Sequence, residues 1–166
     1  MGGPGAGNHD TAETRGWRAA GQLIVPPLRD DRSDGFGVSC RCLADGGVWL
    51  VSLTGEHDLT SIPLLDQYTR HIWPHCRVAI IDLSGVTFIE SGMIAWLLRI
   101  ETALDEGEGF TLSIVEGPAD GAAARLFKRL RMSHVLACYP TVRAALSQTA
   151  AGYGSSSGGS ALGPSG

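Results

Sequence analysis

The segment Val78–Leu83 (VAIIDL) constrains the fold more than any other part of the chain. Five of its six residues are apolar, so a strand formed here has a hydrophobic side chain on each face. Strands of this kind are typical of the centre of a sheet that is covered on both faces. The segment therefore predicts a layered α/β fold with this strand in the middle of its sheet.

Segments of strand and helix character alternate around this central strand. Two strands, Phe36–Leu43 and Val48–Leu53, flank a turn signal and predict a hairpin whose first strand lies at a sheet edge. A turn at Ser84-Gly85 is expected to end the central strand. Helical spacing, caps and breakers predict the remaining elements. These are helices over 62–73, 91–105, 122–130 and 141–146, and strands over 110–115 and 135–138.

The predicted order is β-β-α-β-α-β-α-β-α. Strand-helix-strand units need right-handed crossovers and place their strands parallel. We therefore expect an α/β sandwich with a mostly parallel or mixed sheet of about five strands and four to five helices.

The two ends of the chain differ in composition from its middle. Residues 1–36 mix Gly, Pro, Asp and Arg without periodicity, and Pro26-Pro27 argues against regular structure nearby. Residues 150–166 are rich in Gly and Ser, which is typical of a flexible tail. The expected domain is therefore 37–149, between a disordered N-terminal tail and a flexible C-terminal one.

Charge, cysteines and hydropathy exclude several classes of function. The net charge is −4 and no long run of Lys and Arg is present, which argues against direct nucleic-acid binding. The four cysteines form no Cys-x-x-Cys pair and the histidines have no helical metal spacing, so we expect reduced cysteines, no metal and no cofactor. A signal-peptide pattern and an apolar run of about 20 residues are both missing, so we expect a cytoplasmic protein without membrane association.

Three segments resemble the STAS domains of bacterial anti-sigma factor antagonists. Val51–Leu59 (VSLTGEHDL) is similar to the "GELDL" turn of that family, and Val78–Met93 (VAIIDLSGVTFIESGM) is similar to its "vvlDLsgvtfiDSSGl" segment. Ala124–Leu146 resembles the closing pattern of the family. The middle segment is the specific one, and the three together span nearly the whole expected domain.

The resemblance implies a function for Ser91. In the family, the first serine after the aspartate is phosphorylated by the kinase domain of the anti-sigma factor, and Ser91 holds that position here. The chain departs from the pattern in having Glu90 for the aspartate and Ser91-Gly92-Met93 for Ser-Ser-Gly. The resemblance thus implies a monomer or weak dimer that binds an anti-sigma factor with an ATPase-like serine kinase domain. Phosphorylation would switch it off and so regulate sigma-dependent transcription.

Elementary physical chemistry gives Ser91 a compatible role. A serine between a strand and a helix lies beside the unpaired N–H groups of the first helical turn, and the helix dipole stabilises a phosphate there. A phosphate adds about 1.5–2 negative charges to the carboxylates expected nearby, which disfavours burial in an interface. Ser91 as a simple helix N-cap is the alternative. We expect the partner surface to comprise Glu56, Asp58, Glu90, Ser91, Gly92, Ile94 and Leu98.

Two of these residues, Ile94 and Leu98, form an apolar shoulder on the helix beside its core stripe, which holds Met93, Leu97, Ile100 and Leu104 with Trp96 at its flank. Exposure of the shoulder would favour a partner surface, and burial under a neighbouring helix is the alternative. We expect Ile94 to be exposed, whereas both readings stay open for Leu98.

The remaining polar residues do not form a catalytic set. Asp58 is expected to cap the helix that follows it and to contact a partner, and His57 is expected to be a solvated loop residue. No nucleophile with its base and orienting group accompanies them, so the chain is not expected to be an enzyme. The alternative function is a STAS scaffold or accessory module that is not phosphorylated, in a stressosome-like or lipid-transport complex. A small-molecule or nucleotide sensor has no motif in its support.

Overall fold

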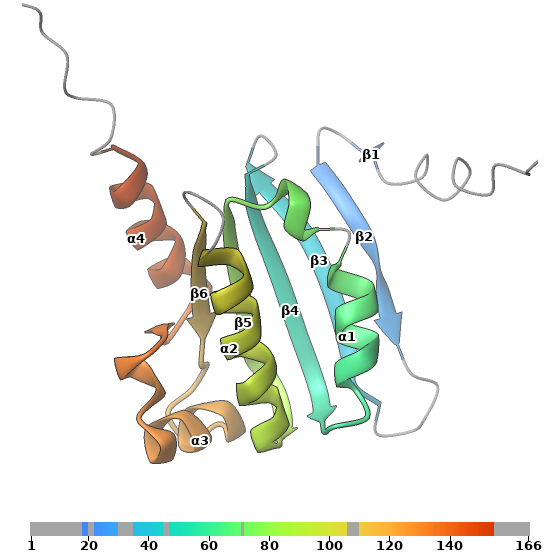
Figure 1. Ribbon diagram of the computed structural model, residues 1–166, viewed down its shortest axis with the longest axis vertical. Helices are drawn as coiled ribbons and strands as arrows, with labels where there is room; N and C mark the ends of the chain where they lie inside the picture. Colours follow the sequence, from blue (N-terminus) through green and yellow to red (C-terminus); the bar gives the residue numbers. More distant parts are fainter. Residues whose placement is uncertain are drawn as a thin grey trace, which may run out of the picture.

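The computed structural model describes residues 18–19, 22–29, 35–44, 47–70, 72–105 and 110–154. Over these ranges the strands form one sheet of seven, in the order in which they occur along the chain (Figure 1). Neighbours are antiparallel from β1 to β4 and parallel from β4 to β7. The strands are β1 (Arg18–Ala19), β2 (Gln22–Arg29), β3 (Gly37–Ala44), β4 (Val48–His57), β5 (Val78–Ile89), β6 (Thr111–Val115) and β7 (Ala137–Tyr139).

Helices cover the sheet on both faces. The four α-helices are α1 (Ile62–Thr69), α2 (Ser91–Asp105), α3 (Ala122–Leu130) and α4 (Val142–Gly154), and two short 3-10 helices span Trp73–His75 and Met132–His134 in the described part of the chain. Buried residues of α1, α2 and α3 form one core cluster with the sheet. A smaller cluster on the opposite face contains Ala145 of α4. The molecule is therefore a helix-sheet-helix sandwich.

The central strand β5 supplies both cores. Ala79 and Ile81 belong to the larger cluster, whereas Val78 and Ile80 belong to the smaller one, and all four are fully buried. Successive side chains of a strand point to opposite faces, so the apolar run VAIIDL feeds both layers. The predicted α/β sandwich with a mixed sheet is confirmed.

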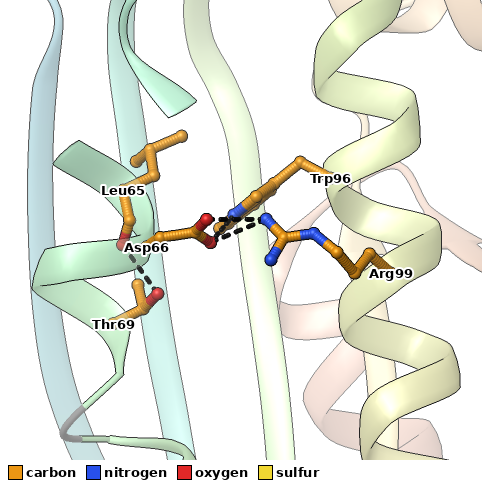
Figure 2. Close-up of polar contacts among 5 residues, drawn as sticks. All are labelled: Leu65, Asp66, Thr69, Trp96 and Arg99. Atoms are coloured by element: carbon orange, nitrogen blue, oxygen red, sulfur yellow. Dashed lines mark hydrogen bonds and ion pairs between the residues drawn. The ribbon is translucent and has the colours of Figure 1, made fainter. Parts of the chain in front are cut away.

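A polar cluster joins α1 and α2, two of the three helices on the larger core. The Asp66 carboxylate of α1 accepts a hydrogen bond from Trp96 Nε1 at 2.8 Å, and both of its oxygens accept from Arg99 Nη2, at 2.8 and 2.7 Å (Figure 2). Trp96 is only 1% exposed, so the carboxylate satisfies an otherwise unpaired buried N–H group. This contact fixes α1 against α2.

The expected turn at Ser84-Gly85 is wrong, because β5 continues through it to Ile89. The extension is possible since β4 also continues, to His57, and stays paired with β5 through two register shifts. Gly85 passes close to the neighbouring strand: a Cβ at this position would lie 2.7 Å from Thr54 Cγ2. Local turn propensity is overridden here by strand pairing.

The N-terminal expectation is wrong for Gln22–Arg29. These residues form β2, antiparallel to β3, so β3 is not the edge strand that the sequence predicted. Pro26-Pro27 lie at a register shift between Val25 and Leu28, where the ladder is interrupted and a missing N–H donor is tolerated. The rest of the expected N-terminal tail, apart from 18–19 and 35–36, lies outside the described residues.

At the other end of the domain, α4 reaches Gly154 rather than Leu146, beyond the expected limit at residue 149. Residues 155–166 of the expected C-terminal tail lie outside the described residues.

Candidate partner-binding site

The ends of β4 and β5 bring two distant segments of the chain together. The strands are parallel and His57 pairs with Ile89 in their register. The backbone N–H of Glu90 then donates to the carbonyl of His57 at 3.0 Å. The loop that follows β4 and the helix that follows β5 therefore start at the same end of the sheet, as parallel pairing requires.

The loop after β4 lies directly on the first turn of α2. The backbone N–H of Leu59 donates to Glu90 Oε2 at 3.2 Å. A Cβ added at Gly92 would lie 2.3 Å from Leu59 Cδ2 and 3.2 Å from Ile62 Cδ1. The glycine is therefore what lets the Leu59 side chain rest on the helix.

Asp58 organises the loop rather than capping α1 itself. Its Oδ1 accepts hydrogen bonds from Thr60 Oγ1 at 2.6 Å, from Thr60 N at 2.8 Å and from Ser61 N at 3.2 Å. The hydrogen bond from the Thr60 hydroxyl is the main reason why the pKa of the Asp58 carboxyl lies below its ordinary value. The residue at the N-cap of α1 is Ser61, three residues after Asp58, so the expectation that Asp58 caps this helix is wrong.

His57 is buried, and the expectation of a solvated loop residue is wrong. It is the last residue of β4 and is 0% exposed. Its ring contacts Phe36 edge-on at 5.6 Å between centroids, and its Nε2 lies 3.2 Å from the carbonyl oxygen of Thr54. Ser61 Oγ lies 3.5 Å from Nδ1. Burial lowers the pKa of His57 from its ordinary value, so the neutral ring is the favoured form beneath the loop.

Ser91 is exposed and is the first residue of α2. The N-cap expected at Ser91 therefore falls one residue earlier, at Glu90, whose carbonyl accepts from the Met93 N–H at 3.0 Å. Among the hydrogen bonds of the described residues, none involves the Ser91 hydroxyl. The hydroxyl is thus accessible beside the N–H groups of a helix N-terminus.

Ile94 does not belong to the exposed surface, and its predicted exposure is wrong. It is 7% exposed and lies in the larger core cluster with Ile89 and Met93. Leu98 is half-buried and packs against the same cluster, so burial is the correct alternative for most of its surface. The cause is that α2 packs against α1 as well as the sheet, which makes its buried face wider than one stripe.

The other predicted surface residues do lie together. Glu56 is exposed in the strand register opposite Phe88, and Asp58, Glu90 and Gly92 are partly exposed around the loop contact. The carboxylates of Asp58 and Glu90 thus lie on the two segments that meet beside Ser91, and Glu56 lies on the strand that leads into the loop. Within the described ranges, no group of His, Cys, Asp and Glu is arranged to hold a metal ion.

Sequence reasoning missed the apolar part of this surface. Leu59 is 64% exposed while its side chain rests on Gly92, and Phe88 is 47% exposed beside the end of β5. A leucine in a polar turn directly before a helix was the available signal for Leu59. We define the loop surface as Glu56, Asp58, Leu59, Glu90, Ser91 and Gly92.

The four cysteines, all of them in the described part of the chain, form no disulfide with one another. Cys40 and Cys42 share one face of β3, as the Cys-x-Cys spacing predicts, and both are buried in the larger core. Burial raises the pKa of the Cys76 and Cys138 thiols to about 12, so their reactive thiolate forms are scarce.

Among the helices of the described residues, none is long and apolar enough to cross a bilayer.

Comparison with known proteins places this architecture. Residues 43–137 match the family model described as "Mlab, STAS domain". A crystal structure of an anti-sigma factor antagonist from Mycobacterium paratuberculosis is similar, with a TM-score of 0.55 and 26% identity over 70% of this chain and 95% of that one. The anti-sigma factor antagonist SpoIIAA in its unphosphorylated form has the same fold, with a TM-score of 0.55 and 11% identity over 69% of this chain and 96% of that one.

A search of curated proteins finds no match. The family model nevertheless covers more than half of the chain, from the end of β3 to the start of β7, and the two solved structures agree with it in fold. The chain therefore belongs to the STAS domain family.

Proposed function

We propose that this protein is an anti-sigma factor antagonist that acts by binding rather than by catalysis. In its unmodified form it binds an anti-sigma factor with an ATPase-like serine kinase domain and so releases a sigma factor for transcription. The observation that carries the proposal is the exposed Ser91 at the start of α2, at the position of the phosphorylated serine in the family pattern. The likeness to the mycobacterial antagonist supports the same role.

The unmodified surface offers two kinds of contact to a partner. The exposed side chain of Leu59 supplies apolar area next to Ser91, and the carboxylates of Glu56 and Asp58 supply charge at its rim. Apolar anchors with a polar rim are typical of protein–protein interfaces. The partner that fits carries an apolar pocket bordered by basic residues.

Phosphorylation of Ser91 changes the charge of this surface without requiring a change of fold. The phosphate lies at a helix N-terminus, where unpaired N–H groups and the helix dipole stabilise it. It adds about 1.5–2 negative charges beside Glu90, close to the loop that carries Asp58. A surface with that charge resists the desolvation that an interface demands, so the partner is released.

The experiment is incubation of the full chain with candidate anti-sigma kinases encoded near its gene, with ATP, followed by intact mass spectrometry. The expected product carries one phosphate on the native chain and none on Ser91→Ala. A kinase that binds the native chain tightly yet adds no phosphate to it would contradict phosphorylation.

A second candidate function is a STAS scaffold or accessory module, of the stressosome or lipid-transport type, that is not phosphorylated. Two observations favour it: Glu90-Ser91-Gly92-Met93 stands where the family pattern has Asp-Ser-Ser-Gly, and the carboxylate of Glu90 accepts a hydrogen bond from the Leu59 N–H. Partner binding that is indifferent to charge at position 91 would favour this candidate.

A further inference from the structure

The charges of this chain are unevenly distributed along its length. All seventeen Asp and Glu residues lie at or before Asp120. Five of the thirteen Lys and Arg residues follow it, so a net-acidic chain ends in a wholly basic segment. Four of these five cations fall within α3 and the residue after it: Arg125, Lys128, Arg129 and Arg131.

The fold gathers three of these cations around a surface hollow. It is lined by Thr87–Ile89 at the end of β5 and by Arg125, Leu126, Lys128 and Arg129 of α3. In Figure 1, α3 lies at the end of the sheet where β5 is followed by α2. Ile89 is two residues from Ser91, so this basic hollow adjoins the loop surface.

Packing fixes the orientation of α3 and leaves its cations available. Ala123 and Phe127 are buried in the larger core, which turns the opposite side of the helix to solvent. Arg125 donates to the backbone carbonyl of Asp120, and no carboxylate of the described residues pairs with Lys128 or Arg129. Unpaired cations on a helix face that also lines a hollow are free to bind an anion.

The hollow also has an apolar component. Phe88 is 47% exposed although it lies at the end of a buried strand, and Leu126 is only partly buried beside it. An exposed aromatic ring among cations suits a ligand that presents both negative charge and an apolar group. A simple inorganic anion would contact the cations of the hollow but leave its apolar side chains uncovered.

We propose that the basic hollow binds a short acidic segment of the protein partner, with an apolar side chain of that segment seated on Phe88. Carboxylates border the hollow on one side, because Glu56 pairs with Phe88 in the strand register and Glu90 directly follows Ile89. They limit the length of the bound anion, since they repel negative charge over roughly a Debye length of about 8–10 Å. A nucleic acid carries phosphates along its whole length and would meet these carboxylates. A short peptide ends before it reaches these carboxylates.

The identity of the partner rests on the proposed function, whereas the chemistry of the segment does not. If the partner is the anti-sigma factor, it contacts two adjacent surfaces of opposite charge. The acidic segment reaches the basic hollow, and a basic-rimmed pocket covers the loop surface. Opposite charges in both places fix the orientation of the complex and raise its association rate.

The test uses the full chain and a fluorescein-labelled peptide of Asp and Glu residues around one Trp and one Leu. Fluorescence anisotropy at low salt is expected to give saturable binding that weakens as salt is added. Lys128→Glu/Arg129→Glu should weaken binding by roughly tenfold or more, because attraction becomes repulsion. Phe88→Ala should weaken it severalfold. The control is Arg143→Glu on α4, an exposed cation outside the hollow, which should bind as the native chain does.

Lys128→Gln/Arg129→Gln repeats the test without adding negative charge to the last turn of α3, where it opposes the helix dipole. Equal affinities for the native chain and both double variants would overturn the proposal, and so would an absence of saturable binding to the native chain. An oligothymidylate of equal charge that binds the hollow as tightly as the peptide would also overturn it.

Titration with an anti-sigma kinase separates this proposal from the proposed function. If the peptide binds as expected but no kinase binds the native chain, the result supports the hollow and contradicts the antagonist role. If the kinase binds the native chain, and the double variants bind both the kinase and the peptide as tightly as the native chain does, the result contradicts the hollow and supports the antagonist role.

Discussion

The backbone N–H of Leu59 donates a hydrogen bond to the carboxylate of Glu90, 31 residues further along the chain, at 3.2 Å. Glu90 thereby couples the loop after β4 to the start of α2, and its own backbone N–H is bound to the carbonyl of His57. The position of Leu59 over Gly92 depends on these contacts. The loop surface is therefore a single unit rather than two neighbouring segments.

The first prediction concerns this coupling. Glu90→Ala removes the acceptor of the Leu59 N–H and should lower the free energy of unfolding by about 0.5–1.5 kcal/mol. Amide exchange at Leu59 should become faster, whereas Glu90→Gln keeps an acceptor and should change both less. Hydrogen exchange by NMR and urea unfolding measure the effect, with Glu101→Ala on α2 as control. Unchanged exchange at Leu59 in Glu90→Ala would refute the coupling.

The second prediction concerns Gly92. A Cβ at this position would lie 2.3 Å from Leu59 Cδ2, so Gly92→Ala must displace the end of that flexible side chain. Stability should change by less than about 1 kcal/mol, since alanine also favours the helix. Partner affinity should fall, because the apolar anchor has moved. Calorimetry with the cognate partner checks this, and Ala95→Ser, at an exposed position of α2, is the control. If Gly92→Ala binds the partner with native affinity, Leu59 is not part of the interface.

The third prediction concerns the contact between α1 and α2 in Figure 2. Asp66→Ala leaves the buried Trp96 N–H without an acceptor and should cost about 1–3 kcal/mol. Arg99→Ala breaks only the exposed ion pair and should cost about 0.2–1 kcal/mol. Asp66→Asn keeps an acceptor for Trp96, so its cost in stability should lie between those of the two alanine variants. Equal costs for the two alanine variants in denaturant unfolding would contradict this assignment.

The fourth prediction concerns pH. The pKa of His57 is lowered in the folded state by burial, from an ordinary value of 6.5 in the unfolded chain. As the pH falls below 6.5 the unfolded chain binds a proton that the folded chain refuses, so stability decreases. The stability that neutral His57 contributes is fully present above pH 6.5. It is lost as the pH falls from 6.5 to the lower pKa of His57 in the folded chain. His57→Gln should flatten this part of the pH dependence, and His134→Gln, at an exposed site, should not. An unchanged slope in His57→Gln would assign the pH dependence elsewhere.

Much of the fold follows from hydrophobic periodicity. The two-sided apolar run at Val78–Leu83 specifies a covered central strand, and the stripe of Met93, Trp96, Leu97 and Ile100 specifies the buried face of α2. The continuation of β5 through Ser84-Gly85 was not predictable from that dipeptide, because the partner strand β4 decides it. The strand at Gln22–Arg29 was hidden by Pro26-Pro27, which occupy a break in the ladder.

The candidate site was predictable in part. Strand alternation from Leu53 places His57 on the core side, and extending the strand by a few residues would have revealed its burial. Ile94 was misplaced because a helix covered on two sides has a wider apolar face than one stripe. The basic face of α3 was overlooked since no long run of Lys and Arg marks it: only Lys128 and Arg129 are adjacent, and apolar residues separate them from Arg125 and Arg131.

The central claim is that negative charge at position 91 ends partner binding. Ser91→Ala, Ser91→Asn and Ser91→Asp should all fold, with a change of at most about 1 kcal/mol, because the side chain is exposed and a carboxylate suits a helix N-terminus. Asparagine and aspartate have nearly the same shape and differ in charge. The decisive measurement is calorimetric titration of the three variants with the cognate anti-sigma factor. The account predicts near-native affinity for alanine and asparagine and markedly weaker binding for aspartate, whereas equal affinities for all three would contradict it.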